Sequence, residues 1–130
     1  MNNLLEAKNL SVYFDSDDGV IKAVDDISFT IKQGETLALV GESGSGKSVS
    51  AMSLMRLNEI TNGYIANGSI KFNLSSNEIV DIVSLKDFRL QKIRGNEISM
   101  IFQEPMTSLN PVLTIGKQIS ESIELHQKLN

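Results

Sequence analysis

Extended, β-forming segments separated by turns make up most of the first third of the chain, and one of them alternates strictly between hydrophobic and polar residues, the pattern of a strand with one buried face. Residues 4–14 contain several β-forming side chains and end at an acidic turn, 15–19. Residues 20–24 resume the extended pattern, and 27–31 (ISFTI) place apolar residues on one face and hydroxyls on the other. This part of the chain is therefore predicted to form antiparallel hairpins.

Two later runs are apolar without alternation, residues 36–40 and 98–102. Strands of a parallel sheet are covered on both faces and have this pattern. We therefore predict that both runs are buried strands. A glycine-rich loop separates the first run from residues 48–57, which contain good helix formers and no proline. Residues 58–67 are rich in turn-forming residues.

The remaining segments predict a second hairpin and two helices. Short strands are expected at 69–72 and 79–83. The stretch 84–87 (SLKD) resembles a capping box with aspartate in place of glutamate, and it would open a helix that stops before Gly95. A final helix is expected over 114–129, with apolar residues on one face: Ile115, Ile119 and Ile123.

Composition limits the classes of function that fit. A chain of 130 residues suffices for one domain. The net charge of −4 and the pI of about 4.9 give no basic footprint for nucleic acid or an anionic membrane. The absence of cysteine excludes disulfides and cysteine metal sites. No signal peptide is apparent and no apolar run approaches the ~20 residues of a membrane helix, so a membrane role is expected to go through partners.

The glycine-rich loop carries the chemistry. Its sequence, GESGSGKS at 41–48, matches the phosphate-binding pattern G-x-x-x-x-G-K-[ST] and lies between a predicted strand and a predicted helix. Glycines permit the positive φ angles with which successive backbone N–H groups enclose phosphate oxygens. The lysine supplies a point charge to the outer phosphates, and the serine hydroxyl suits Mg²⁺. The candidate phosphate-binding residues are Gly41, Glu42, Ser43, Gly44, Ser45, Gly46, Lys47, Ser48 and, through its backbone, Val49.

Two further stretches indicate which family of P-loop proteins the chain resembles. Antiparallel strands precede the phosphate loop, and ISMIFQEPMTSLNP at 98–111 places Gln103 after an apolar run. These stretches, with AVDDISFTI at 23–31, resemble the ATP-binding subunits of ABC transporters, in particular the oligopeptide, dipeptide and nickel importer subfamily. The resemblance spans essentially the whole chain and is weakest over 58–83.

The resemblance assigns roles to individual residues. Lys47 and Gln103 are the expected catalytic residues, and Ser48 and Gln103 the expected Mg²⁺ ligands. Gln103 matches the Q-loop glutamine of the family. That glutamine contacts Mg²⁺ or the attacking water, and it lies in the region where the membrane subunit docks. Phe14 matches the aromatic residue that stacks on adenine, while Tyr13 is the alternative on the opposite face of the strand. ATP and Mg²⁺ are the implied cofactors.

The resemblance also implies a fold and a domain organisation. The expected fold is an α/β P-loop NTPase core of an ABC ATPase, with an N-terminal antiparallel β subdomain, truncated at the start of the helical subdomain. Residues 1–130 would be the N-terminal part of one ATP-binding domain, with the P-loop at 41–48 and the Q-loop at about 102–111. The LSGGQ signature, the Walker B motif and the switch histidine do not occur. Residues 79–82 (IVDI) are interpreted as a hairpin strand and His126 as an ordinary helical residue.

The implied function is ATP binding in an importer ATPase, with hydrolysis in the intact subunit and none expected from these 130 residues alone. Implied partners are membrane-spanning permease subunits, a second ATP-binding subunit in a homo- or heterodimer and, indirectly, a solute-binding protein. The expected location is the cytoplasmic face of the membrane. Three alternatives remain: an ABC-type ATPase without a transport role, a non-catalytic nucleotide-binding fragment, and a P-loop kinase or GTPase. We also expect the chain to self-associate or to be marginally stable, because buried strands would lack neighbours.

Overall fold

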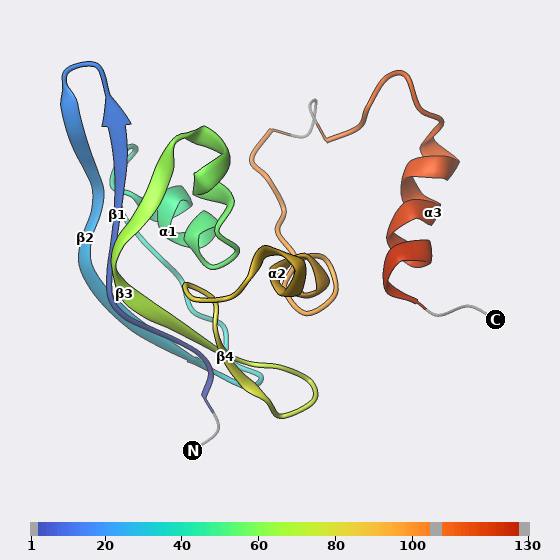
Figure 1. Ribbon diagram of the computed structural model, residues 1–130, viewed down its shortest axis with the longest axis horizontal. Helices are drawn as coiled ribbons and strands as arrows, with labels where there is room; N and C mark the ends of the chain where they lie inside the picture. Colours follow the sequence, from blue (N-terminus) through green and yellow to red (C-terminus); the bar gives the residue numbers. More distant parts are fainter. Residues whose placement is uncertain (1–2, 105–107, 128–130) are drawn as a thin grey trace. The chain divides into compact units, whose positions relative to one another are not determined.

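The computed structural model describes residues 3–104 and 108–127, which form two compact units, Met1–Lys86 and Asp87–Asn130. The first unit contains the strands and the first helices, and the second contains the remaining helices (Figure 1). The elements in chain order are β1 (Asn3–Ser16), β2 (Gly19–Lys32), α1 (Lys47–Ser53), the 3₁₀ helix η1 (Leu57–Thr61), β3 (Gly63–Asn73), β4 (Ile79–Asp81), α2 (Asp87–Ile93) and α3 (Ile115–His126).

The first unit is built on a four-stranded antiparallel sheet with the order β2-β1-β3-β4. This confirms the predicted hairpins. The two predicted segments 20–24 and 27–31 belong to one continuous strand, β2, and β3 begins at Gly63, six residues before the predicted start at Ser69. Residues 79–82 contribute β4, which pairs with β3 as the hairpin interpretation requires. The Asp81 carboxylate accepts hydrogen bonds from the backbone N–H groups of Ile70 and Val83, each at 3.1 Å.

The three long strands bend at one level of the sheet. Asn9, Asp26 and Gly68 have φ angles of 48°, 54° and 102°. The pairing register of β1 shifts around Asn9 both with β2 and with β3. The Asn9 side-chain amide donates to the Asp26 carboxylate at 2.8 Å, and the Asn9 backbone N–H donates to the Ser28 hydroxyl at 2.8 Å. Bulges increase the local curvature of a strand. The sheet consequently curves around α1 (Figure 1).

The concave side of the sheet supplies the core of the first unit. Inward-facing strand residues are almost fully buried: Leu10, Val12 and Ile70 are 0% exposed, as is Ile82, which follows β4. Apolar burial of this kind contributes about 25 cal/mol per Å². The buried apolar side chains of this unit are Leu5, Ala7, Leu10, Val12, Val24, Met55, Ile70, Phe72, Val80 and Ile82.

The two predicted buried strands do not form. Residues 36–40 have no regular structure, and Val40 is 93% exposed. Residues 98–102 are also irregular, apart from an isolated parallel bridge between Arg94 and Ile98, and Ile101 is 99% exposed. A strand needs a neighbour to pair its backbone N–H and C=O groups. Within the described ranges neither run has a paired strand beside it, so both predictions are wrong for this structure.

The helices differ from prediction mainly at their ends. Helix α1 ends at Ser53 rather than at residue 57, and η1 follows. The helix predicted after 84–87 forms as α2, but it begins at Asp87, and the Ser84 hydroxyl donates to the Asp81 carbonyl at 3.2 Å. Gly95, with a φ of 78°, follows α2 as predicted.

Helix α3 begins at Ile115, one residue after the predicted start, and Thr114 is its N-cap: the Thr114 side chain accepts a hydrogen bond from the Lys117 N–H at 3.3 Å. It ends at His126, and positions 128–129 of the predicted helix lie outside the described residues. In the described ranges no helix combines the length and apolar character that crossing a bilayer requires.

Candidate functional site

The glycine loop 41–48 connects the irregular segment 36–40 to α1. Gly44 and Gly46 have φ angles of 78° and 88°, in the left-handed region that side chains disfavour. The Ser45 N–H donates to the Glu42 carbonyl at 3.2 Å, which closes a turn. Gly46 is the N-cap of α1, and its carbonyl accepts the Ser50 backbone N–H and the Ser50 hydroxyl, each at 2.8 Å. The loop therefore has the left-handed glycines that the motif predicts.

Lys47 folds back into the loop that precedes it. Its ammonium donates to the carbonyls of Gly41 and Glu42, both at 2.6 Å, and to the Ser45 hydroxyl at 3.1 Å. A Cβ on Gly41 would lie 2.5 Å from the Ser45 hydroxyl oxygen and 3.8 Å from the Lys47 ammonium. The loop thus forms a cradle around a positive charge, and a side chain at Gly41 would have to displace the Ser45 hydroxyl that accepts from Lys47.

The β2 strand forms the wall behind the loop. A Cβ on Gly46 would lie 2.5 Å from the Ala23 carbonyl oxygen and 3.3 Å from a methyl of Val24. Since one of these neighbours is backbone, it cannot turn aside as a side chain would. Gly46 is therefore required both for its φ angle and for the close approach of α1 to the sheet. Sequence reasoning did not identify Ala23 or Val24, because this contact joins segments far apart in the chain.

The two aromatic candidates differ in surroundings. Phe14 pairs with Gly63 across β1 and β3, and its ring lies 2.6 Å from the position that a Gly63 Cβ would occupy. Tyr13 donates its hydroxyl to the Asp25 carboxylate at 3.0 Å and packs edge-on against Tyr64. The Lys22 ammonium lies 5.3 Å from the Tyr13 ring. Tyr13 therefore already has three partners, whereas the Phe14 ring lies beside Gly63 and is half-buried.

Beyond the loop, buried polar groups join α1 to η1. The Val49 carbonyl accepts the Ser53 hydroxyl at 2.7 Å and the Asn58 side-chain amide at 3.0 Å. Asn58 and Ser53 are 3% and 0% exposed, and the Asn58 amide also donates to the Ser53 hydroxyl at 2.7 Å. Ser48, on the first turn of α1, is exposed.

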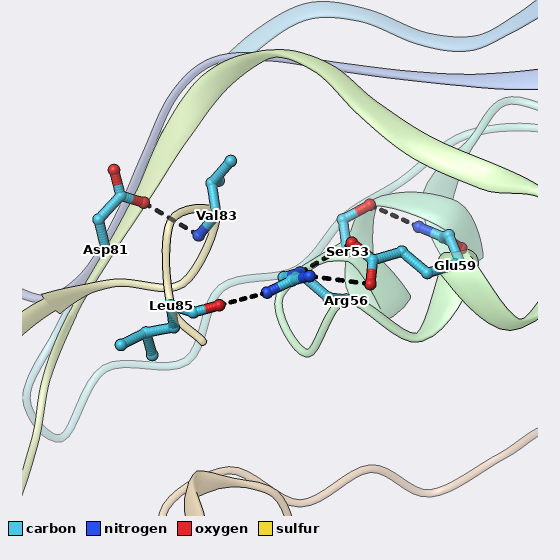
Figure 2. A network of polar contacts seen from close by, with 7 residues as sticks. Ser53, Arg56, Glu59, Asp81, Val83 and Leu85 are labelled. Atoms are coloured by element: carbon cyan, nitrogen blue, oxygen red, sulfur yellow. Dashed lines mark hydrogen bonds and ion pairs between the residues drawn. The ribbon is translucent and has the colours of Figure 1, made fainter. Parts of the chain in front are cut away.

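Arg56 fixes the turn between α1 and η1. Its guanidinium forms two hydrogen bonds to the Glu59 carboxylate, at 2.8 and 3.0 Å, and donates to the Leu85 carbonyl at 2.7 Å. Figure 2 shows this side chain between Glu59 and Leu85. Bidentate pairing of arginine with a carboxylate is among the stronger polar contacts. The end of α1 is therefore tied to the segment that precedes α2.

Gln103 belongs to the second unit. It is exposed and lies in an irregular segment after 98–102. The next residues of the predicted Q-loop, 105–107, lie outside the described part of the chain. The structure thus brings together the residues of the phosphate loop, while the role of Gln103 stays a prediction from the resemblance.

The residues present fit a nucleotide with Mg²⁺. The loop provides left-handed glycines and an enclosed lysine, and phosphate oxygens can replace the carbonyls that now accept from Lys47. The exposed Ser48 hydroxyl is an oxygen ligand of the type Mg²⁺ prefers, which usually binds through one or two protein groups plus phosphates. Among the described residues, no group of three or more His, Cys, Asp or Glu side chains could hold a metal ion.

A glycine loop that encloses its own lysine between a sheet and a helix defines a P-loop nucleotide-binding protein. More specifically, the chain belongs to the ABC transporter family, whose model matches residues 24–130. This agrees with the family resemblance of the sequence.

Curated relatives are similar along nearly the whole chain. An oligopeptide transport ATP-binding protein, AppD of Bacillus subtilis, is 53% identical over 129 residues, which is 99% of this chain and 38% of the relative. A putative peptide import ATP-binding protein of Brucella melitensis is 53% identical over 126 residues, 97% of this chain and 36% of the relative. The glutathione import ATP-binding protein GsiA of Escherichia coli is 48% identical over 125 residues, 96% of this chain and 20% of the relative.

Solved structures agree with the fold. The dimeric structure of a bacterial ABC transporter cassette matches with a TM-score of 0.77 and 25% identity, covering 97% of this chain and 49% of that one. A post-hydrolysis state of an ATP-binding cassette, bound to ADP and Pi, matches with the same values. The fold is therefore that of an ABC ATPase. The chain spans between about a fifth and two fifths of the length of these curated relatives, and about half of the solved chains.

Proposed function

We propose that the chain binds ATP as part of an ABC importer ATPase that powers the uptake of peptides or a related small solute. The observation that carries this proposal is the cradle around Lys47, whose ammonium is held by the carbonyls of Gly41 and Glu42. Relatives named for oligopeptide, peptide and glutathione import support the solute class. Dipeptides and nickel are included in the proposal because the sequence resembles the oligopeptide, dipeptide and nickel importer subfamily.

In this proposal each site residue has a defined task. Lys47 and the backbone N–H groups of the loop bind the β- and γ-phosphates of ATP, and phosphate oxygens replace the loop carbonyls to which Lys47 now donates. Ser48 and Gln103 ligate Mg²⁺, which supplies charge neutralisation at the phosphates. Phe14 stacks on adenine, because its ring lies against backbone and remains half exposed.

The domain and partner assignments follow from the same proposal. Residues 1–130 form the N-terminal part of one ATP-binding domain, with its Q-loop at about 102–111. A second ATP-binding subunit and membrane-spanning permease subunits are the direct partners, and a solute-binding protein is an indirect one. Through these partner subunits the chain lies at the cytoplasmic face of the membrane. The dimeric cassette among the solved structures supports the second subunit. In the longer subunit, bound ATP is hydrolysed.

A second candidate function is nucleotide binding without turnover. The specific observation in its favour is that these 130 residues contain no LSGGQ motif, no Walker B motif and no switch histidine. The Asp81 carboxylate, which comes nearest to a Walker B aspartate in sequence, accepts hydrogen bonds from two backbone N–H groups instead. We propose that the 130-residue chain binds ATP and does not hydrolyse it.

A calorimetric titration with Mg-ATP tests the proposal, with phosphate release measured on the same sample. Lys47→Ala removes the enclosed charge, and ATP binding should fall at least about tenfold, a loss typical of a charged hydrogen-bond donor. Lys86→Ala makes the same charge change at an exposed position outside the loop and should bind as the unsubstituted chain does. Equal affinity in all three proteins would refute the nucleotide site, and phosphate release that depends on Lys47 would refute the absence of turnover.

A further inference from the structure

Gly63 stands directly against the aromatic ring proposed to stack on adenine. A Cβ at Gly63 would lie 2.6 and 2.8 Å from two carbons of the Phe14 ring, closer than real Cβ atoms approach. The backbone of Gly63 itself does not have a positive φ, so alanine fits its conformation. Any side chain at this position would therefore displace the ring rather than strain the strand, since Phe14 is only half-buried and can swing outward.

Asn58 closes the other side of this contact. Its Cβ lies 3.0 Å from the same position beside Gly63, and its amide donates to the Val49 carbonyl at 3.0 Å. Asn58 is 3% exposed, so these bonds are shielded from water and fix the side chain strongly. Val49 is only one residue beyond the serine that ends the phosphate loop. A continuous path of contacts thus runs from the Phe14 ring through Gly63 and Asn58 to the helix of the loop.

We propose that Gly63 and Asn58 are positioning residues that hold the Phe14 ring at a set place relative to α1. The base and the triphosphate of one nucleotide would then be bound at a matched separation. This inference rests on the proposed function, because it assigns the neighbours of the base-binding ring. It adds two residues, one in η1 and one at the start of β3, to the residues that the phosphate-loop and Q-loop motifs identify.

Comparing two ligands distinguishes binding at the base subsite from binding at the phosphate loop. Mg-ATP engages both subsites, whereas Mg-tripolyphosphate engages the phosphate loop alone. In Gly63→Ala, the displaced ring should weaken Mg-ATP binding about 5- to 150-fold, the range for loss of one base stack, and leave tripolyphosphate binding unchanged. Gly116→Ala in α3 is the matched control, since nothing lies within 4 Å of a Cβ there, and it should change neither affinity.

A double-mutant cycle assigns the effect to the ring. In Phe14→Leu the stack is already lost, so adding Gly63→Ala should weaken Mg-ATP binding less than twofold further. Full additivity of the two substitutions would overturn the inference. So would an equal loss of Mg-ATP and tripolyphosphate affinity in Gly63→Ala, since that result indicates general damage to the fold.

An NMR measurement on the unsubstituted chain keeps the inference testable if Gly63→Ala does not fold. The Phe14 ring should shift the Gly63 Hα resonances by its ring current, and Mg-ATP should change that shift while tripolyphosphate does not. The Asn58 side-chain amide should remain protected from exchange in both complexes. Absence of a ring-current shift at Gly63 would overturn the inference. If Mg-ATP binding does not depend on Lys47, the proposed function is refuted. If it depends on Lys47 but the results for Gly63 differ from those above, only the present inference is refuted.

Discussion

Two glycines of the phosphate loop allow the energetic cost of backbone strain to be measured separately from the cost of a steric clash. Gly44 and Gly46 both have positive φ angles, 78° and 88°. Nothing lies within 4 Å of a Cβ on Gly44, whereas a Cβ on Gly46 would lie 2.5 Å from the Ala23 carbonyl oxygen. Alanine at Gly44 therefore introduces strain in φ alone, and alanine at Gly46 adds a clash with the backbone of β2.

The magnitudes follow from these two terms. A left-handed conformation costs an L-residue roughly 1–2 kcal/mol. Overpacking against a neighbour that cannot turn aside costs roughly 1–3 kcal/mol more. Gly44→Ala should therefore lower the free energy of unfolding by about 1–2 kcal/mol and Gly46→Ala by about 2–5 kcal/mol. The second loss is a large part of a typical domain stability of roughly 5–15 kcal/mol.

Urea denaturation followed by far-UV circular dichroism measures both variants on one scale. Gly46→Ala should unfold at a clearly lower urea concentration than Gly44→Ala, with a similar dependence of the unfolding free energy on urea concentration. Equal midpoints for the two variants would refute the argument that α1 lies against Ala23, because strain in φ is common to both.

Three further predictions concern the aromatic residue, the Q-loop and the exposed apolar runs. Phe14→Leu should weaken Mg-ATP binding by roughly 1–3 kcal/mol, whereas Tyr13→Leu, which removes the ring that packs against Tyr64, should leave it unchanged; the reverse order of the two affinities in calorimetry would assign the base to Tyr13. Gln103→Ala should lower the Mg²⁺ dependence of ATP binding more than binding itself, and titrations at several Mg²⁺ concentrations that match the unsubstituted chain would contradict the metal role. The chain should self-associate through its exposed apolar runs, so Ile101→Lys should shift sedimentation toward monomer, and an unsubstituted chain that remains monomeric at high concentration contradicts this.

Local patterns predicted the parts of the fold that depend on near neighbours. The alternation in 27–31 anticipates a half-buried strand because side chains alternate with a period of two. The phosphate loop was recognisable because its glycines and lysine act within eight consecutive residues, 41–48. The start of α3 was predicted to within one residue, since the apolar spacing of Ile115, Ile119 and Ile123 is a local helical pattern.

Long-range contacts set the parts that the sequence could not predict. Residues 36–40 and 98–102 have the composition of buried strands, but a strand forms only where another supplies hydrogen bonds. Asn9 and Gly68 lie opposite each other on the adjacent strands β1 and β3, so neither irregularity can be predicted from its own sequence neighbours. Gly63 matters because Phe14 lies against it, almost fifty residues away in sequence, and no local pattern carries that relation.

Backbone amide NMR of the loop tests the central claim most directly. On addition of Mg-ATP, the amide resonances of Gly44, Gly46 and Lys47 should shift together and saturably, because their N–H groups gain phosphate oxygens as acceptors. The same addition to Lys47→Ala should produce little change at these amides. Saturable shifts confined to other parts of the described chain, or none at all, would contradict the claim that this loop is a phosphate-binding site.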